Sequence, residues 1–376
     1  MLLQKKKLLV TVLALLLSGI FTSCKNQSSM NTDTKFEWWS AWDAPRYYPM
    51  EVLDGAFLLK GQYQTPLRQG FTQGQKWGGN SDEMGEGERP LPDELDVYWY
   101  SFTEDKFYEG AFKLPQDTML KLFREGFNQF RFKKHVTYDY ITVGLAPGGV
   151  VSVWLKGNWN GKEVEVGYFK AHEGERLTWE HFDSEYYRSK GDSAWTAYRR
   201  EMLDGLDAAD HLKRYGIPFG IWDTYREKFN FRPVMVYEDK DTARITDEIH
   251  MEFFNGEEES LSLNELKENP FKMRARIRYF EAFWTFGQNM RYIQLEFDEQ
   301  ELFNAYKDVY EGNPNTQVEL QIHMNKENDH FDQFLVRVEK GNYKEVQLRH
   351  TKINFYIDDV SNRYHYNVFK NDSNNN

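Results

Sequence analysis

The chain has 376 residues, which suggests two folding units, and its 40% hydrophobic content excludes an intrinsically disordered protein. Its formal net charge of −12 argues against nucleic acid as a partner, because neutralising phosphates requires clustered lysine and arginine. The aromatic content of 16% favours strands over a helical bundle, so we expect a protein built mainly of sheets.

Residues 1–23 have the pattern of a signal peptide. Consecutive lysines precede an apolar run from Leu8 to Leu17, which is the order found in a secretory leader. The run is shorter than the roughly 20 residues that a transmembrane helix requires. The leader ends in Phe21-Thr22-Ser23-Cys24, which resembles the bacterial lipobox, although phenylalanine stands where leucine is usual. We therefore predict cleavage just before Cys24.

Cys24 is the single cysteine of the chain and the predicted point of lipid attachment. A thiolate can be alkylated by a lipid donor, and two or more acyl chains, such as palmitate, hold a protein on a membrane almost permanently. The alternative is that Cys24 is merely a residue near the end of a cleaved leader. Without a second cysteine the chain can form no internal disulfide, so its stability must come from packing.

Residues 24–36 are polar, and we predict that they form a lipidated, flexible tether. The membrane would then be a partner through the lipid anchor. This places the protein in the bacterial cell envelope, on the outer membrane, at either its periplasmic or its surface face.

The first predicted lobe covers residues 37–175. Apolar and polar residues alternate in several runs, which is typical of strands with one buried face. Pro115 opens a predicted helix whose residues Met119, Phe123 and Phe127 recur at helical spacing. The predicted strands span 94–100, 107–114, 129–135, 137–144, 150–156 and 163–169.

Residues 176–240 are predicted to form a partly helical connector that packs on both lobes. Trp195, Tyr198 and Met202 recur on one helical face, and the sequence Gly216-Ile217-Pro218 ends the element. The stretch is too apolar for a loose linker.

The second predicted lobe, residues 241–365, repeats the order of the first. A helix over 299–311 carries Leu302 and Tyr306 on one face. Residues 366–376 are predicted to be a disordered tail, because the chain ends in polar residues. The predicted strands span 290–297, 317–324, 333–339, 344–349 and 353–357.

These patterns predict an α+β fold of two similar lobes, each an antiparallel sheet with one inserted helix, joined by the connector. The helical segments 112–123 and 296–306 align with each other, which favours an internal repeat. The alternative is that sheet-rich sequences align by chance.

The sequence lacks the G-x-S-x-G, H-E-x-x-H and EF-hand patterns, and we expect no catalytic residue, metal site or cofactor. Residues 157–163 superficially resemble a phosphate-binding loop, but Glu163 stands where serine or threonine is required, so we predict a hairpin turn. The nine histidines are scattered and are predicted to lie on the surface. The acidic clusters Asp82–Glu88 and Glu257–Glu259 are expected in solvated loops, with calcium binding as the alternative.

An aromatic patch formed by Trp38, Trp39, Trp42, Tyr47 and Tyr48 follows the predicted tether. If these rings are exposed, they could stack on sugars or contact lipid head groups. If they are buried, they fasten the first residues of the fold to the core, which is the more common fate of large aromatic residues.

Three stretches carry a resemblance to a known family: LPDELDVYWYSFTEDKFYEGAFKLP (91–115), ITVGLAPGGVVSVWLKG (141–157) and HLKRYGIPFGIWDTY (211–225). They are similar to bacterial lipoproteins grouped as domain-of-unknown-function family 2931, and the resemblance covers most of residues 45–358. It implies an envelope lipoprotein of Gram-negative bacteria and brings no catalytic residues with it.

We therefore expect a membrane-anchored envelope lipoprotein that is not an enzyme. Its sheet edges or the groove between its lobes would bind another envelope protein or a glycan. One alternative is a hydrolase of envelope polysaccharide with two carboxylates in the groove. Another is an immunity-type inhibitor that binds a toxin through an acidic face. The sequence identifies no ligand-binding residues.

Overall fold

The computed structural model describes residues 35–74, 76–80, 82–85, 87–129, 134–157, 161–176, 192–238, 246–286, 289–324, 331–339, 342–358 and 366–370. The predicted signal peptide, Cys24 and most of the predicted tether lie outside this part of the chain. The fold is α+β, with mostly antiparallel sheets, and the described residues contain six helices. None of these six is both long enough and apolar enough to cross a membrane.

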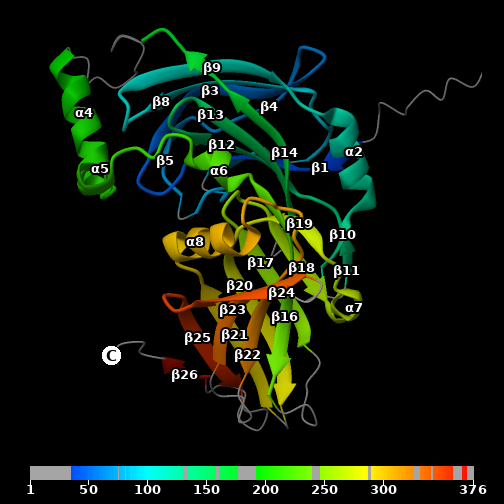
Figure 1. Ribbon diagram of the computed structural model, residues 1–376. Coiled ribbons are helices and arrows are strands. Elements are labelled where there is room, and N and C mark those ends of the chain that lie inside the picture. Colours follow the sequence, from blue (N-terminus) through cyan, green and yellow to red (C-terminus); the bar gives the residue numbers. More distant parts are fainter. Residues whose placement is uncertain are drawn as a thin grey trace, which may run out of the picture.

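The first half of the chain folds into two layers of strands that lie against each other (Figure 1). The outer sheet has the order β15 (His172–Glu173), β9 (Lys106–Lys113), β8 (Glu94–Ser101), β3 (Met50–Leu59) and β4 (Gln62–Pro66), and β5 (Gly70–Thr72) also pairs with β3. The inner layer has the order β14 (Glu163–Lys170), β13 (Val150–Lys156), β12 (Tyr140–Ala146), β2 (Trp39–Asp43) and β6 (Asp82–Met84).

Smaller elements complete the first half. Helix α2 (Gln116–Glu125) lies at one end of the two layers (Figure 1). Two short antiparallel pairs flank it, β1 (Lys35–Glu37) with β7 (Glu88–Pro90) and β10 (Phe127–Gln129) with β11 (Lys134–Val136).

The inner strands β12 and β13 are apolar along almost their whole length. Every residue from Ile141 to Ala146 and from Val150 to Leu155 is buried. Strands that are covered on both faces have such continuous apolar runs, whereas half-exposed strands alternate. This layer therefore forms the centre of the first hydrophobic core.

The inner layer continues into the second half, so that one sheet of eleven strands runs through both halves. Strand β14 pairs with β18 through Glu163 and Glu258. Beyond β14 the sheet has the order β18 (Glu258–Ser262), β17 (Thr246–Phe253), β20 (Ile277–Phe286), β21 (Asn289–Glu296), β25 (Lys352–Asp358) and β26 (Tyr366–Lys370).

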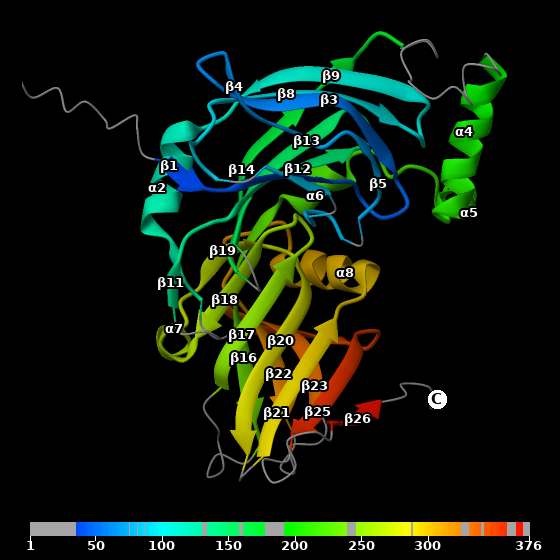
Figure 2. The ribbon, with the colours of Figure 1, turned by 180° about the vertical axis from the view of Figure 1, so that it is seen from behind.

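A five-stranded sheet faces this part of the long sheet in the second half. Helix α8 (Glu299–Tyr310) lies at the end nearest the first half, and α7 (Leu263–Glu268) follows β18 (Figures 1 and 2). A second hydrophobic core joins the two sheets and α8 through Phe231, Trp284 and Leu302. The five strands are β19 (Lys272–Ala275), β16 (Lys228–Tyr237), β22 (Val318–Met324), β23 (Phe331–Glu339) and β24 (Asn342–Leu348).

The two halves meet in close contact at the turn after β17. Gly78 and Gly256 both have positive φ, and a Cβ atom on Gly78 would lie 2.8 Å from the Gly256 Cα. The indole of Trp154 donates a hydrogen bond of 3.1 Å to the carbonyl oxygen of Asn255, and its ring meets Trp77 edge to face. Only glycine fits this contact without backbone strain.

The connector supplies three helices, α4 (Asp192–Gly205), α5 (Ala208–Tyr215) and α6 (Ile221–Tyr225). Helix α4 packs on the first half through Trp195, which contacts Tyr100 and Phe107. Helix α6 lies between the halves, next to α8 (Figures 1 and 2). The connector thus contacts both halves.

Several sequence predictions are confirmed. The fold class is α+β, and helices α2 and α8 form at the two predicted segments. The predicted strands 94–100, 150–156 and 163–169 correspond to β8, β13 and β14 within one residue at each end. The similarity of the two lobes and the limits of the domains stay predictions.

Other predictions are corrected by strand pairing. The predicted connector, 176–240, contains β16, which pairs with β22 and β19. The tail 366–376 contains β26, which pairs with β25, and the tether 24–36 contains the start of β1. The predicted strand 129–135 overlaps β10 and β11, which pair with each other. Strands β1, β10, β11 and β26 are short, whereas β16 is a long strand paired on both sides. In each case pairing with a neighbouring strand determines the structure.

Candidate functional site

A pocket of about 580 Å³ lies between the two halves, and this volume is usual for small-molecule sites. Its walls come from the turn after β2, the segment around Trp77, helices α5 and α6, and the start of α8. It is lined by Pro45, Arg46, Tyr47, Tyr48, Lys76, Trp77, His211, Tyr215, Pro218, Ile221, Trp222, Tyr225, Phe254, Arg278, Glu299 and Gln300.

The first wall is the turn that follows β2. The Tyr48 amide donates to the Pro45 carbonyl oxygen, and Tyr47 adopts a positive φ of 70°. The Tyr48 hydroxyl donates to the Gly216 carbonyl oxygen and lies 3.2 Å from Nε2 of His211. Burial raises the pKa of Tyr48 to about 12, so the phenol keeps its proton at neutral pH and can donate.

Helices α5 and α6 form the second wall. The His211 ring stacks on Tyr47 with a centroid separation of 4.2 Å, and Tyr215 packs beside it. Trp222, only 2% exposed, meets Trp77 at the base of this wall. Burial and the charge of Arg46 lower the pKa of His211, so its ring is neutral at neutral pH.

The third wall joins α6 to the second half. The Tyr225 ring stacks on Phe254 with centroids 5.3 Å apart, and its hydroxyl donates to Oε1 of Glu299 at 2.9 Å. Burial raises the pKa of Glu299, although the bond from Tyr225 opposes this shift. Among the described residues that line the pocket, Glu299 is the single carboxylate.

Two cations of the pocket wall also belong to a buried ion-pair network. Nζ of Lys76 lies 3.1 Å from Oε2 of Glu252 and also pairs with Glu258. Arg278 pairs with Glu252. Burial alone would raise the pKa of Glu252, but the charges of Lys76 and Arg278 outweigh burial and hold this pKa below its ordinary value.

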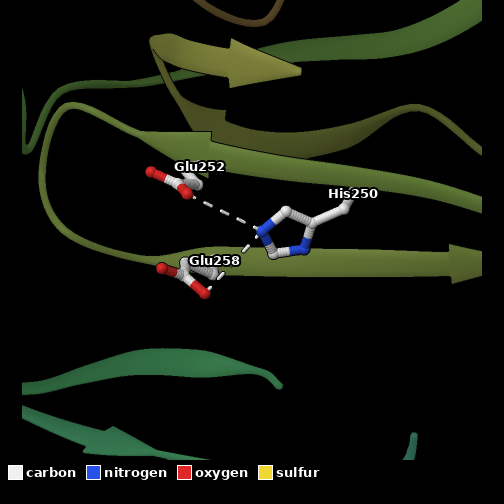
Figure 3. Close-up of side chains that lie close together, drawn as sticks. All are labelled: His250, Glu252 and Glu258. Atoms are coloured by element: carbon white, nitrogen blue, oxygen red, sulfur yellow. Dashed lines mark ion pairs between the residues drawn. The ribbon is translucent and has the colours of Figure 1, made fainter. Parts of the chain in front are cut away.

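His250 lies at the centre of this network, between the two carboxylates (Figure 3). Its Nε2 is 3.9 Å from Glu252 and 3.8 Å from Glu258, and its Nδ1 is 2.9 Å from Oγ of Ser260. An imidazole and two carboxylates within 4.8 Å could hold a transition metal. The ammonium of Lys76 already binds both carboxylates, however, so a metal would have to displace it. We interpret the cluster as a network of ion pairs.

The network extends to the place where the long sheet passes between the halves. Glu163 is buried and pairs with Lys156. Burial, and then the charge of Glu258, raise the pKa of Glu163 to about 8. The Lys156 ammonium also lies 3.4 Å from the carbonyl oxygen of Gly78. The ion pairs of Lys76 with Glu252 and Glu258 connect the halves beside the pocket.

The predicted aromatic patch divides into two groups, apart from Trp39, which is half-buried on β2. Trp38 and Trp42 are fully buried, so they fasten the first residues of the fold to the core, as expected. Tyr47 and Tyr48 line the pocket instead. Cys24, the predicted lipid attachment residue, lies outside the described residues.

Three predictions about polar residues are wrong in part. His250, which was expected on the surface, is only 4% exposed. Glu258 and Glu259, which were expected in a solvated loop, lie in β18, where Glu258 is buried and Glu259 binds Arg274. Residues 82–84 of the first acidic cluster form β6, which pairs with β2. The sequence around these residues shows the charges but not their partners on neighbouring strands.

The sequence predicted a binding groove between the lobes, but apart from Tyr47 and Tyr48 it did not identify the residues that line the pocket. The segment 211–225 supplies six of its lining residues, and the concentration of aromatic residues between glycines and a proline was the one available signal. Trp77, Phe254 and Glu299 come from distant parts of the chain, and no local pattern connects them.

Comparison with known proteins gives a family match. A family model described as "Protein of unknown function (DUF2931)" matches residues 24–220, which is more than half of the chain. The chain therefore belongs to this family, although the match ends before α6, whereas the resemblance seen in the sequence was expected to reach residue 358. No curated protein and no solved structure matches the chain.

Proposed function

We propose that this member of the DUF2931 family is a membrane-anchored envelope lipoprotein that binds a small ligand, without chemical conversion, in the pocket between its halves. The observation that carries this proposal is the pocket itself. Its size is that of a ligand site, and aromatic walls surround a small number of polar groups. Side chains from distant parts of the chain converge on it, which is typical of a built site.

The composition of the pocket favours binding over hydrolysis. Hydrolysis of a glycoside by the usual route requires two carboxyl groups about 5 to 10 Å apart. Glu299 has a raised pKa, but no second carboxylate lines the described pocket beside it. The neighbouring carboxylates Glu252 and Glu258 are held by Lys76. An immunity-type inhibitor would bind through a convex acidic face, and the aromatic hollow does not have this character.

The membrane anchor is proposed from the sequence alone, through the leader and the lipobox-like segment ending in Cys24. Replacing Cys24 with alanine should move the protein from the membrane fraction of cells to the soluble fraction. Ser23→Ala is the matched control, because it keeps a small residue and leaves the thiol in place. Membrane retention of Cys24→Ala equal to that of the control would refute the anchor.

Ligand binding can be tested at the mouth of the pocket. Tyr215 is 71% exposed, so Tyr215→Ala should leave the fold intact and remove an aromatic contact. Losing such a contact should weaken binding about five- to tenfold. The assay is titration of the purified protein with soluble oligosaccharides from bacterial envelopes, followed by calorimetry and by tryptophan fluorescence, since Trp77 and Trp222 line the pocket.

Tyr63→Ala is the matched control, because Tyr63 is 62% exposed and does not line the pocket. It should bind as tightly as the unsubstituted protein. Equal affinities of the Tyr215 and Tyr63 variants would place binding elsewhere, and an absence of any binding would refute the proposed function.

A further inference from the structure

The charges around the pocket are arranged unevenly. Arg46, Lys76 and Arg278 line the cavity, whereas the carboxylates that pair with Lys76 and Arg278, on Glu252 and Glu258, are not among the lining residues. Cationic groups therefore lie nearer to a bound ligand than the anions that neutralise them. Because the interaction between charges weakens with distance, the cavity favours an anionic group.

Arg46 is the cation most available to a ligand. Its side chain is exposed, and its guanidinium lies over the Tyr47 ring, 4.8 Å from the centroid. Within the described part of the chain it forms no ion pair. The protein as a whole has a net charge of −12, yet the described pocket lining carries Arg46, Lys76 and Arg278 against one carboxylate. A guanidinium binds a carboxylate through two parallel hydrogen bonds.

The single carboxylate of the described pocket lining is held in the wall. Glu299 accepts a hydrogen bond from the hydroxyl of Tyr225, where α6 meets α8. Burial disfavours its charged form and raises its pKa, while the bond from Tyr225 opposes this shift. The described lining therefore carries three cationic side chains, Arg46, Lys76 and Arg278, against one carboxyl group.

The walls present flat rings with polar groups at their edges. Tyr47, His211 and Tyr215 form one run of packed rings, and Tyr225 with Phe254 forms another. A sugar ring has an apolar face of C–H groups and a rim of hydroxyls, so it can lie on such a wall and form hydrogen bonds at its edge.

We infer that the pocket takes an acidic saccharide, whose ring lies on the aromatic walls and whose carboxylate lies among Arg46, Lys76 and Arg278. This inference rests on the proposed function and adds the chemical class of the ligand. The sugar ring accounts for the aromatic walls, and the carboxylate accounts for cations that face the cavity.

The test compares matched acidic and neutral sugars. Calorimetry on the full-length protein in detergent would measure hexuronate disaccharides of gluco, galacto and manno configuration, each beside the neutral hexose disaccharide of the same linkage. At least one uronate should bind about tenfold more tightly than its neutral counterpart. This difference should shrink as salt is raised, because ions screen exposed charges.

Arg46→Gln should remove most of that difference and leave the affinity for the neutral sugar unchanged. Arg200→Gln is the matched control, because Arg200 is an exposed arginine on α4 that does not line the pocket. It should retain the preference for the uronate.

Any one of four results would overturn the inference. Equal affinities for acidic and neutral sugars would show that the pocket does not select an anionic group, although the proposed ligand pocket would stand. An unchanged preference for uronate in Arg46→Gln would place the anion elsewhere. Tighter binding of uridine monophosphate than of every uronate would show that the site does not select a sugar acid. Binding of no oligosaccharide at all would refute the proposed function as well.

Discussion

Removing the Lys76 ammonium should destabilise the protein because a buried carboxylate, Glu258, and a half-buried one, Glu252, depend on it. Lys76 is 24% exposed and binds Glu252 and Glu258 at once. Breaking a buried ion pair from one side costs about 3–5 kcal/mol. The partial exposure of Lys76 reduces this cost, so we expect Lys76→Met to lower the free energy of unfolding by about 2–4 kcal/mol at pH 7.5.

The loss should depend on pH in a defined direction. In the unsubstituted protein the pKa of Glu252 is held below its ordinary value of 4.5, since Lys76 and Arg278 outweigh its burial. A depressed pKa contributes stability above the unfolded value, and this contribution is lost as the pH falls. Without Lys76, burial acts with less opposition. Protonation at lower pH then relieves the uncompensated charge, so the cost of Lys76→Met should be smaller at pH 5 than at pH 7.5.

The measurement is chemical denaturation followed by tryptophan fluorescence at both pH values. Lys272→Met is the control, because Lys272 pairs with Glu259 but is 47% exposed; it should change the free energy of unfolding by less than about 1 kcal/mol. A loss below about 1 kcal/mol for Lys76→Met, or one of equal size at pH 5 and pH 7.5, would refute the role assigned to the ion-pair network.

Further predictions concern the contact between the halves, a buried carboxyl group and a short helix. Gly78→Ala would place a Cβ atom 2.8 Å from a backbone atom at a residue with positive φ, so it should lower the free energy of unfolding, measured by thermal unfolding, by about 2–4 kcal/mol. Gly87 also has a positive φ, but a Cβ atom there would have no neighbour within 4 Å, so Gly87→Ala should lower it by only about 1–2 kcal/mol. Equal losses for the two variants would contradict the tight contact. The pKa of Glu163 is raised to about 8 by burial and then by the charge of Glu258, so stability should fall as the pH rises from the unfolded value of 4.5 through 8. The melting temperature of Glu163→Gln, relative to that of the unsubstituted protein, should therefore be higher at pH 9 than at pH 5. A difference that does not change with pH would exclude this carboxyl group as the cause. Ser262 caps α7, and Ser262→Ala should cost about 1 kcal/mol in chemical denaturation; an unchanged midpoint would show that the cap contributes nothing.

The regular elements of the fold could be predicted because their signals are local. Helix α8 has apolar residues at helical spacing, and β13 is a continuous apolar run, so each is determined by a few adjacent residues. Helix α7 was missed although Ser262 and Glu265 form a capping box, which is itself a local signal. Strand β16 depends on pairing with the distant strand β22, and β26 depends on pairing with β25, the strand before it in the chain; no local pattern indicates either pairing.

The candidate site was much less predictable than the fold. Lys76 lies far along the chain from His250 and Glu258. Pairing of β17 with β18 brings His250 and Glu258 together, and Lys76 meets Glu258 only in the folded protein. The composition predicted that the acidic side chains would be exposed to solvent, because most acidic clusters in proteins are exposed. In this protein, neighbouring cations compensate the cost of burying Glu258.

The contact of Gly78 with Gly256 bears on how a ligand reaches the pocket. Two backbones that touch, with the Trp154 indole bonded across the same junction, leave little room for one half to swing against the other. The protein would act as a rigid receptor whose pocket is already formed before the ligand binds. The association rate would then be set by diffusion of the ligand into the pocket. X-ray scattering in solution would give the same radius of gyration with and without ligand.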